Sequence, residues 1–186
     1  DRLSPTGGGR IVGFSTFMRL TATIDGEEVV AFFSGDTIVA REYWGESILA
    51  RTWGTTMIAE AERIGGRVYW FLICSGYKTW RFLPVFFRAF HPNPGSPTPP
   101  REQHVLDTLA AAKFGGEYRR EEGVVRFERP TPLRPGVADV TEERLRDPRI
   151  AFFERITPGH IHGDELVCLT EISRANLTRA GLRMLG

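Results

Sequence analysis

The stretch Thr37-Ile38-Val39-Ala40-Arg41-Glu42-Tyr43-Trp44-Gly45-Glu46-Ser47-Ile48-Leu49 decides the fold, because an apolar strand in it ends in a turn that opens a helix. The first N–H groups of a helix lack intrahelical acceptors and lie at the positive end of its dipole, so they bind phosphate groups well. Gly45 and Ser47 would let such a ligand approach closely. The alternative is an ordinary strand-helix junction in which Ser47 caps the helix.

An antiparallel hairpin is predicted before this stretch. Residues 12–24 alternate apolar and polar side chains almost strictly, which indicates a half-buried strand. Asp25-Gly26 is a strong turn signal, since both central positions of the favoured hairpin turn need a positive φ. Residues 29–39 then form the returning strand, and Ser34-Gly35-Asp36 within it indicates a β-bulge.

A helix and a buried strand are predicted after the turn. From Ser47 onward, apolar residues recur at helical spacing until Gly65-Gly66 ends the helix. Residues 68–74 are continuously apolar, which is typical of a strand buried on both faces. Strand, turn, helix and strand make a crossover unit. Residues 77–90, dense in aromatic side chains, are predicted to be partly helical, with Pro84 starting or kinking the second half.

The Pro-rich residues 93–100 predict a linker between a core at 10–92 and a C-terminal α+β extension at 101–186. Thr98 is expected to cap a helix that ends at Gly115-Gly116. Further elements are expected in the extension: a hairpin at 118–127, a helix capped by Asp147 up to residue 156, a strand at 165–172 and a terminal helix at 176–185. Residues 1–9 are expected to be a flexible lead-in. The chain is thus predicted to be an α+β protein with a mixed, mainly antiparallel sheet flanked by helices.

Composition bounds the function. The chain has 186 residues, of which 41% are hydrophobic and 25% charged, as in a globular protein of one or two small domains. Lys+Arg 24 against Asp+Glu 23 gives a net charge of +1, which is not the basic field that nonspecific nucleic-acid binding needs. No apolar stretch is long enough to span a bilayer, so no membrane span is expected.

The two cysteines indicate the compartment. Cys74 and Cys168 are expected to be buried free thiols, as in a cytoplasmic protein, and a single disulfide between them is the alternative. The oligomeric state stays open.

The element order and the segment Glu42-Tyr43-Trp44-Gly45-Glu46-Ser47 resemble the core of the GNAT acyltransferase superfamily, over roughly residues 10–92. In that family a valine-rich strand leads into a Q/R-x-x-G-x-G/A motif. Gly45 matches the central glycine, whereas Glu42 opens the motif here and Ser47 holds its last small position. The family usually has a first strand and helices before the hairpin, where this sequence has only residues 1–9, so we expect a fragment, a trimmed chain, or an N-terminal portion that is supplied otherwise.

The resemblance implies an acyltransferase that moves an acyl group from acetyl-CoA or another acyl-CoA to an amine or similar nucleophile. Backbone groups of Val39 and Ala40 would pair with the pantetheine arm, and N–H groups between Tyr43 and Ile48 would surround the pyrophosphate. Trp44 would shield this site or pack on its own helix. The implied binding residues are Ile38, Val39, Ala40, Tyr43, Trp44, Gly45, Glu46, Ser47 and Ile48.

Acyl transfer to an amine needs a base for the amine, stabilisation of the oxyanion and often a proton for the leaving thiolate. The resemblance implies a carboxylate base near the strand, and Asp36 is the acidic residue best placed for it, unless it only belongs to the bulge. The family's leaving-group acid is a tyrosine, but Phe86 or Phe87 holds that position here, and Ser75 and Tyr77 are the predicted substitutes. A noncatalytic binding or scaffold module with the same fold is therefore the alternative.

Two further patterns have competing interpretations. An aromatic cluster would line a large acyl pocket or form ordinary core; its members are Trp70, Phe71, Trp80, Phe82, Phe86, Phe87 and Phe90. The segment His160-Ile161-His162-Gly163-Asp164-Glu165 would put two histidines on one face of a strand near carboxylates. Because no other histidine or cysteine cluster lies nearby in the sequence, we predict no metal site.

Overall fold

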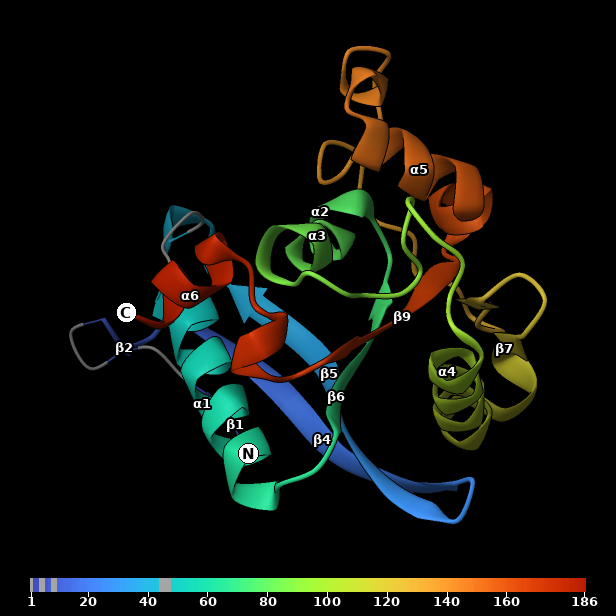
Figure 1. Ribbon diagram of the computed structural model, residues 1–186. Helices are drawn as coiled ribbons and strands as arrows, with labels where there is room; N and C mark the ends of the chain where they lie inside the picture. Colours follow the sequence, from blue (N-terminus) through green and yellow to red (C-terminus); the bar gives the residue numbers. More distant parts are fainter. Residues whose placement is uncertain (1, 4–5, 8–9, 44–47) are drawn as a thin grey trace. The chain divides into compact units, whose positions relative to one another are not determined.

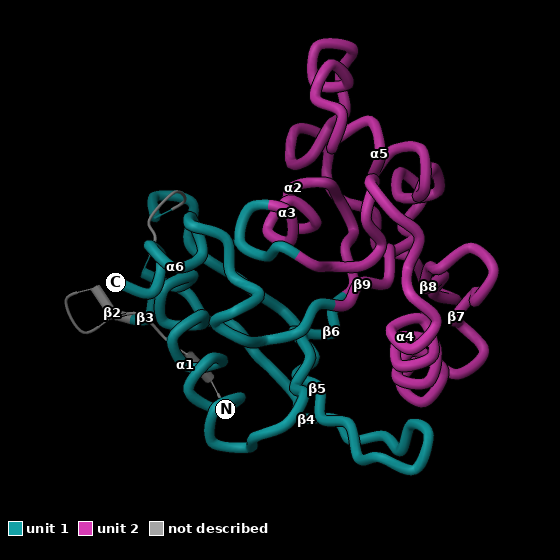
Figure 2. The backbone as a smooth tube through the Cα atoms, in the orientation of Figure 1, with its two compact units in different colours: residues 1–72, 85–88, 170–186 teal, residues 73–84, 89–169 magenta. Residues whose placement is uncertain are grey.

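A computed structural model describes residues 2–3, 6–7, 10–43 and 48–186 of the chain. The chain divides into two compact units, which Figure 2 distinguishes by colour. Unit 1 contains residues 1–72, 85–88 and 170–186, and unit 2 contains residues 73–84 and 89–169. Residues 93–100, the predicted linker, lie inside unit 2 in this division.

Unit 1 is built on a long hairpin, a crossover helix and a parallel strand (Figure 1). Its elements are β1 (Arg2–Leu3), β2 (Thr6–Gly7), β3 (Arg10–Ile11), β4 (Gly13–Ile24), β5 (Glu27–Val39), the 3-10 helix η1 (Arg41–Tyr43), α1 (Ile48–Ile64), the 3-10 helix η5 (Arg174–Asn176) and α6 (Arg179–Leu185). Two strands are shared between the units: β6 (Val68–Cys74) lies mostly in unit 1, and β9 (Glu165–Glu171) lies mostly in unit 2.

The hairpin of β4 and β5 has the predicted turn. Asp25 and Gly26 have φ angles of +52° and +82°, which a two-residue turn of this kind requires. The strands pair antiparallel from Ile24 opposite Glu27 at the turn to Gly13 opposite Val39. The sequence prediction of this hairpin is confirmed.

The crossover unit is also confirmed. Helix α1 ends before Gly65 and Gly66, whose φ angles of +73° and +69° are conformations that glycine adopts without strain. Strand β6 then returns parallel to β5, with Val30 opposite Val68 and Phe33 opposite Phe71. Every residue of β6 is buried except Ile73, which is half-buried, as its continuous apolar sequence predicted.

Helix α6 packs on α1 inside unit 1 (Figure 1). Gly54 of α1 permits this close approach, because a Cβ at that position would lie 2.6 Å from Met184 Cε and 3.3 Å from Leu185 Cδ2. Helix α6 is shorter than the predicted 176–185, because the Thr178 hydroxyl caps it by accepting from the Gly181 N–H at 3.1 Å.

The N-terminal residues that the structure describes are strands. In β1, Arg2 pairs with Thr16 and Leu3 with Ser15, and β2 pairs with β3. The expectation of a flexible lead-in is therefore wrong for residues 2–3 and 6–7, because their backbone joins the outer edge of β4 and a small hairpin.

Unit 2 combines short strands with helices. Its further elements are α2 (Tyr77–Trp80), α3 (Phe82–Phe86, which ends in unit 1), α4 (Pro100–Phe114), the 3-10 helix η2 (Gly115–Glu117), β7 (Tyr118–Arg119), β8 (Val124–Val125), the 3-10 helix η3 (Arg144–Arg146), α5 (Pro148–Ile156) and the 3-10 helix η4 (Pro158–His162). In this unit β9, β8 and β7 are hydrogen-bonded antiparallel neighbours in that order.

Two helix starts in unit 2 test the capping predictions. Asp147 caps α5 as predicted, since its Oδ1 accepts from the Arg149 N–H at 2.9 Å. The predicted cap of α4 is wrong: Pro99 occupies the N-cap position with an extended backbone, not Thr98, and Pro100 begins the helix. A proline fits this first position because its missing N–H would have no helical partner there.

The predicted fold class is confirmed. The molecule is α+β, and its strand pairing is mixed: β5 and β6 are parallel, whereas β4–β5, β7–β8 and β8–β9 are antiparallel. In the part of the chain that the structure describes, every helix is too short or too polar to cross a membrane.

Candidate functional site

The candidate site is the second half of β5 together with the turn that follows it, all in unit 1. The parallel pairing of β5 with β6 runs from Val30 to Phe33. Strand β5 continues for six more residues, 34–39, which keep only β4 as a pairing partner among the described strands. Residues 35–38 are exposed, in contrast to the buried residues 29–33.

A β-bulge marks the point where β5 changes. Ser15 lies opposite Thr37 and Phe17 opposite Ser34, so Thr16 alone faces both Gly35 and Asp36. The predicted bulge is confirmed. Gly35 is needed there, because a Cβ at this position would lie 2.6 Å from Thr16 Oγ1. A bulge re-aims the side chains beside it, and Asp36 is exposed at this bend.

Beyond the bulge, contacts with β4 fix the direction of the strand. The hydroxyls of Ser15 and Thr37 are hydrogen-bonded at 2.8 Å, and the Ala40 N–H donates to Val12 O at 2.8 Å. Because backbone groups alternate along a strand, the N–H and C=O of Thr37 and Val39 point to the opposite edge. Ala40, one of the two predicted pantetheine contacts, thus uses its N–H within the hairpin, whereas Thr37, which the prediction omitted, faces the other edge.

The turn after β5 is only partly described. The 3-10 helix η1 is closed by the Tyr43 N–H, which donates to Ala40 O at 2.9 Å, and α1 begins at Ile48. The predicted phosphate-binding residues Trp44, Gly45, Glu46 and Ser47 lie outside the described residues. The first turn of α1 contains no acidic side chain, so no carboxylate on this turn opposes the positive end of the helix dipole.

Aromatic side chains pack around the place where the pairing of β5 with β6 ends. Trp70 Nε1 donates to Ser34 Oγ at 2.8 Å, next to the bulge. The Trp70 ring lies 4.4 Å from the ring of Trp53 on α1 and 5.8 Å from that of Phe87, measured between centroids. Trp70 and Phe87, two members of the predicted cluster, therefore meet in unit 1. Trp53 lies on α1 and was not among the residues predicted for this cluster.

The predicted proton donors lie in unit 2, whereas Asp36 lies in unit 1. Ser75 is half-buried and precedes α2. Tyr77 is 3% exposed, and the Arg144 guanidinium lies 5.7 Å from the centre of its ring. Trp80 and Phe90, also in unit 2, form a second aromatic group with Phe152, which the sequence did not link to them.

A buried carboxylate in unit 2 was not predicted. Asp107 on α4 is 6% exposed and accepts from Tyr118 Oη at 2.6 Å and from Arg120 Nε at 2.8 Å. Gln103 Nε2 donates to it as well, at 2.8 Å. Burial, with the hydrogen bond to Asp107, raises the pKa of the Tyr118 phenol well above its usual value. These contacts join α4 to β7, and helical periodicity gave no signal for them because Asp107 is polar.

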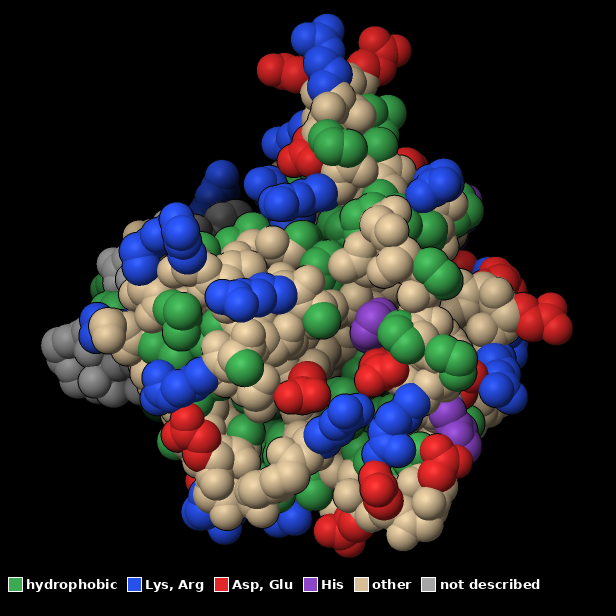
Figure 3. Space-filling model, in the orientation of Figure 1, with side chains coloured by type: hydrophobic (Ala, Val, Ile, Leu, Met, Phe, Trp, Pro, Cys, Tyr) green, Lys and Arg blue, Asp and Glu red, His purple; other side chains and the backbone are tan. Residues whose placement is uncertain are grey.

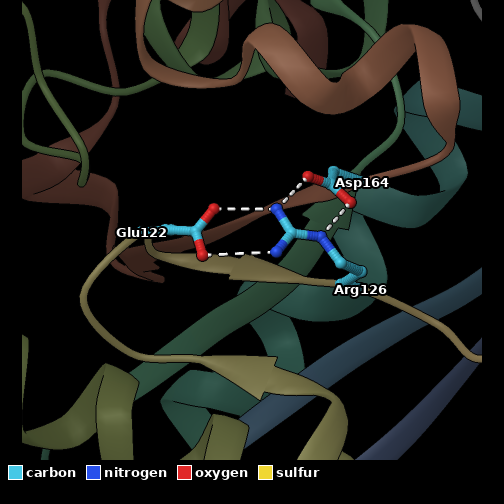
Figure 4. A network of polar contacts seen from close by, with 3 residues as sticks. All are labelled: Glu122, Arg126 and Asp164. Atoms are coloured by element: carbon cyan, nitrogen blue, oxygen red, sulfur yellow. Dashed lines mark hydrogen bonds and ion pairs between the residues drawn. The ribbon is translucent and has the colours of Figure 1, made fainter.

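A second polar network holds the loop before β9. Arg126 lies between Glu122 and Asp164, as Figure 4 shows. Its Nε and Nη2 donate to the Asp164 carboxylate at 2.9 Å and 2.7 Å, and its Nη2 also donates to Glu122 Oε2 at 2.7 Å. The hydrogen bonds that Arg126 donates to Asp164 first, and then to Glu122, raise the pKa of Arg126 further above its usual value. The network closes the β7–β8 hairpin onto the start of β9.

The two histidines of the possible metal motif are not on a strand. They lie in the 3-10 helix η4, where residues two apart do not share a face. His160 is buried, with Nε2 at 2.7 Å from Glu154 Oε2, whereas His162 is exposed. Within the residues described, no three His, Cys, Asp or Glu side chains are grouped so as to hold a metal ion.

The cysteines are free thiols in unit 2. Both Cys74 and Cys168 are fully buried and neither forms a disulfide. Burial, with the neighbouring Cys74, raises the pKa of the Cys168 thiol well above its usual value, which makes a thiolate nucleophile unfavourable there.

Comparisons with known proteins give no relative for this chain: no family model, no curated protein and no solved structure matches it.

Proposed function

We propose that the chain is a GNAT-type acyltransferase that moves an acyl group from acetyl-CoA or another acyl-CoA to an amine or similar nucleophile. The single observation that carries this proposal is the second half of β5, residues 34–39, which extends past its pairing with β6. The amide groups of a pantetheine arm would add to this edge in the way that a peptide adds a strand to a sheet. Thr37 would be the backbone partner, since its N–H and C=O point away from β4.

The start of α1 would receive the pyrophosphate in this proposal. The N–H groups of its first turn have no partners within the helix, and no acidic side chain belongs to that turn. The order of hairpin, 3-10 turn, helix and parallel strand supports the proposal, since these are the elements on which the resemblance rests.

The proposed chemistry is direct transfer. The amine nitrogen attacks the thioester carbon, the C–N bond forms and the C–S bond breaks; one proton leaves the nitrogen and the CoA thiolate takes one up. Asp36 is the proposed base, supported by its exposed position at the bulge beside the proposed pantetheine edge. Ser75 and Tyr77, the proton donors expected from the sequence, lie in unit 2, so the proposed site in unit 1 assigns them no part in this step.

A noncatalytic CoA-binding module with this fold is the second candidate. It is favoured by Phe86 and Phe87, which hold the position of the family's tyrosine acid and carry no proton to donate. Phe87 is 5% exposed and packs on Trp70, a role in the core that needs no chemistry. For either candidate we propose a reducing compartment, the cytoplasm, which is supported by the two buried thiols.

Titration calorimetry with acetyl-CoA and longer acyl-CoAs tests binding, and release of free thiol with a panel of amines tests transfer. Binding with thiol release supports the enzyme, and binding without it supports the module. Absence of binding overturns both. For the enzyme, Asp36→Asn is expected to lower thiol release at unchanged affinity, whereas Asp25→Asn, in the hairpin turn that precedes β5, is the control.

A further inference from the structure

A long segment of unit 2, between β8 and α5, has little regular structure. The structure describes every residue from 126 to 147, and it shows one short 3-10 helix there, η3. Structureless loops longer than about 12–15 residues are uncommon in compact proteins, and many of them are lids or binding loops. Residues 130–146 are called the strap below, and Figure 1 shows them in orange, leading into α5.

The hydrogen bonds of the strap are internal. The Gly136 N–H donates to both oxygens of the Asp139 carboxylate, at 2.8 Å and 2.9 Å, and Arg144 Nη1 donates to Asp139 O at 2.7 Å. The Leu145 N–H donates to Thr141 O at 3.0 Å. With the described residues as partners, strap residues form hydrogen bonds only between positions 134 and 147. The strap can therefore keep its shape when it moves relative to the rest of unit 2.

Three strap side chains contact the segment that follows β6. A Cβ on Gly76 would lie 2.8 Å from Leu133 Cδ1 and 3.1 Å from Ala138 Cβ, so glycine is needed for this close approach. The Arg144 guanidinium lies 5.7 Å from the centre of the Tyr77 ring, a cation–π contact. Gly76 and Tyr77 are both buried. The strap therefore covers the segment through small apolar contacts and one cation–π contact.

Little of the strap itself is buried. Among its residues, all of which the structure describes, Ala138 is the one that is buried, at 7% exposed, and Leu133 is 40% exposed. Its outer end has the sequence Glu142-Glu143-Arg144-Leu145-Arg146, and Figure 3 shows charged side chains of both signs there. Elements with few buried apolar contacts open at a low cost in free energy.

We infer that the strap is a lid that opens as one piece and uncovers residues 75–77. Its two ends act as hinges: Pro130 lies against Gly163, where a Cβ would be 2.8 Å from Pro130 Cβ, and Asp147 caps α5. Opening breaks the contacts with residues 75–77 and keeps the hydrogen bonds within the strap, so it costs less free energy than unfolding of unit 2. This inference does not depend on the proposed function.

The reactivity of a thiol at position 138 tests the lid in the full chain. Ala138→Cys puts a thiol at the buried position of the strap, and we expect it to react with dithionitrobenzoate at least about tenfold faster than the fully buried Cys74 and Cys168. In this background Gly76→Ala should raise the rate about tenfold, because the added Cβ pushes the strap away. Arg144→Gln removes the cation–π contact and should raise the rate about threefold.

Two matched substitutions are the controls. At Gly116, also in unit 2, an added Cβ meets nothing within 4 Å, so Gly116→Ala should leave the rate unchanged. Arg146→Gln removes an exposed arginine from the same 3-10 helix as Arg144 and should also leave it unchanged.

The inference is overturned if the thiol of Ala138→Cys reacts as slowly as Cys74 and Cys168, because the strap then opens only when the unit unfolds. It is also overturned if Gly76→Ala and Arg144→Gln leave the rate unchanged. Circular dichroism verifies folding. If Ala138→Cys does not fold, amide hydrogen exchange of residues 75–80 replaces the thiol: faster exchange in Arg144→Gln than in the wild type supports the lid, and equal exchange overturns it.

Discussion

The two halves of β5 have different surroundings. Residues 29–33 are buried, and most of them are paired with β4 on one edge and β6 on the other. Among the strands that the structure describes, residues 34–39 pair with β4 and not with β6, and most of their side chains are exposed. The bulge at Gly35 and Asp36 lies near the boundary between the halves.

This difference in burial and pairing suggests that one half of β5 contributes to the stability of the fold and the other half to ligand binding. A strand edge without a partner strand presents N–H and C=O groups that another chain or a ligand can pair with, which proteins usually avoid. Here β4 and the Ser15–Thr37 hydrogen bond hold the second half in an extended form without β6. The first half should therefore determine folding and the second half ligand binding.

The largest expected effect is on folding, from the first half. Phe33→Ala removes a ring that is 7% exposed and packs on Phe71, and we expect it to lower the free energy of unfolding by about 3–4 kcal/mol. Ile38→Ala, in the second half, removes a side chain that is 57% exposed and should cost at most about 0.5 kcal/mol. Urea denaturation measures both. Similar losses of unfolding free energy in Phe33→Ala and Ile38→Ala would contradict the claim that the first half of β5 determines folding.

The next effect concerns the boundary. Gly35→Ala would put a Cβ 2.6 Å from Thr16 Oγ1, and we expect a loss of about 1–2 kcal/mol in unfolding free energy. Adding Thr16→Ala removes the clashing oxygen and leaves the Thr16 Cβ at 3.8 Å, so the double variant should recover most of the loss. A double variant no more stable than Gly35→Ala would show that the bulge does not depend on this contact.

Ligand binding by the second half can be tested at one backbone atom. Thr37→Pro removes the N–H that faces away from β4 and leaves the ladder to β4 intact, as proline is tolerated on such an edge. We expect it to weaken acetyl-CoA binding about tenfold, the effect of one lost hydrogen bond. Thr37→Val keeps the N–H, loses the bond to Ser15 and serves as the control in the same calorimetric titration. Equal affinities of the two variants would contradict the proposed pairing.

The smallest expected effect is at Ser34, directly after the residues of β5 that pair with β6. Ser34→Ala leaves the buried Trp70 Nε1–H without its acceptor, which should cost about 1 kcal/mol in thermal or urea unfolding. In a Trp70→Phe background the same substitution should be nearly neutral. A loss of the same size in both backgrounds would mean that Ser34 acts through other contacts.

Local signals in the sequence predicted much of the fold. Asp25-Gly26 defined the hairpin, Gly65-Gly66 the end of α1, and Asp147 the start of α5, because each residue type satisfies a backbone requirement within a few positions. The strand at Val68–Cys74 followed from burial on both faces. These features depend on near neighbours in the chain.

Features that depend on distant partners were missed. Residues 2–3 pair with β4, but the short, glycine-rich sequence of residues 1–9 has no pattern that predicts a strand. The Asp107 carboxylate is buried because Tyr118 and Arg120 donate to it, and nothing in the helical pattern of α4 indicates this. In the candidate site the sequence predicted the strand and helix start, but only the register showed that the backbone groups of Thr37 point away from β4 and that the Ala40 N–H points toward it.

Amide hydrogen exchange of β5 with and without acetyl-CoA tests the central claim most directly. The account predicts that acetyl-CoA slows exchange in residues 34–40 and at the start of α1, while residues 29–33, already paired and buried, keep their exchange rates. Unchanged exchange in residues 34–40 at saturating acetyl-CoA, or slowing confined to other parts of the chain, would contradict it.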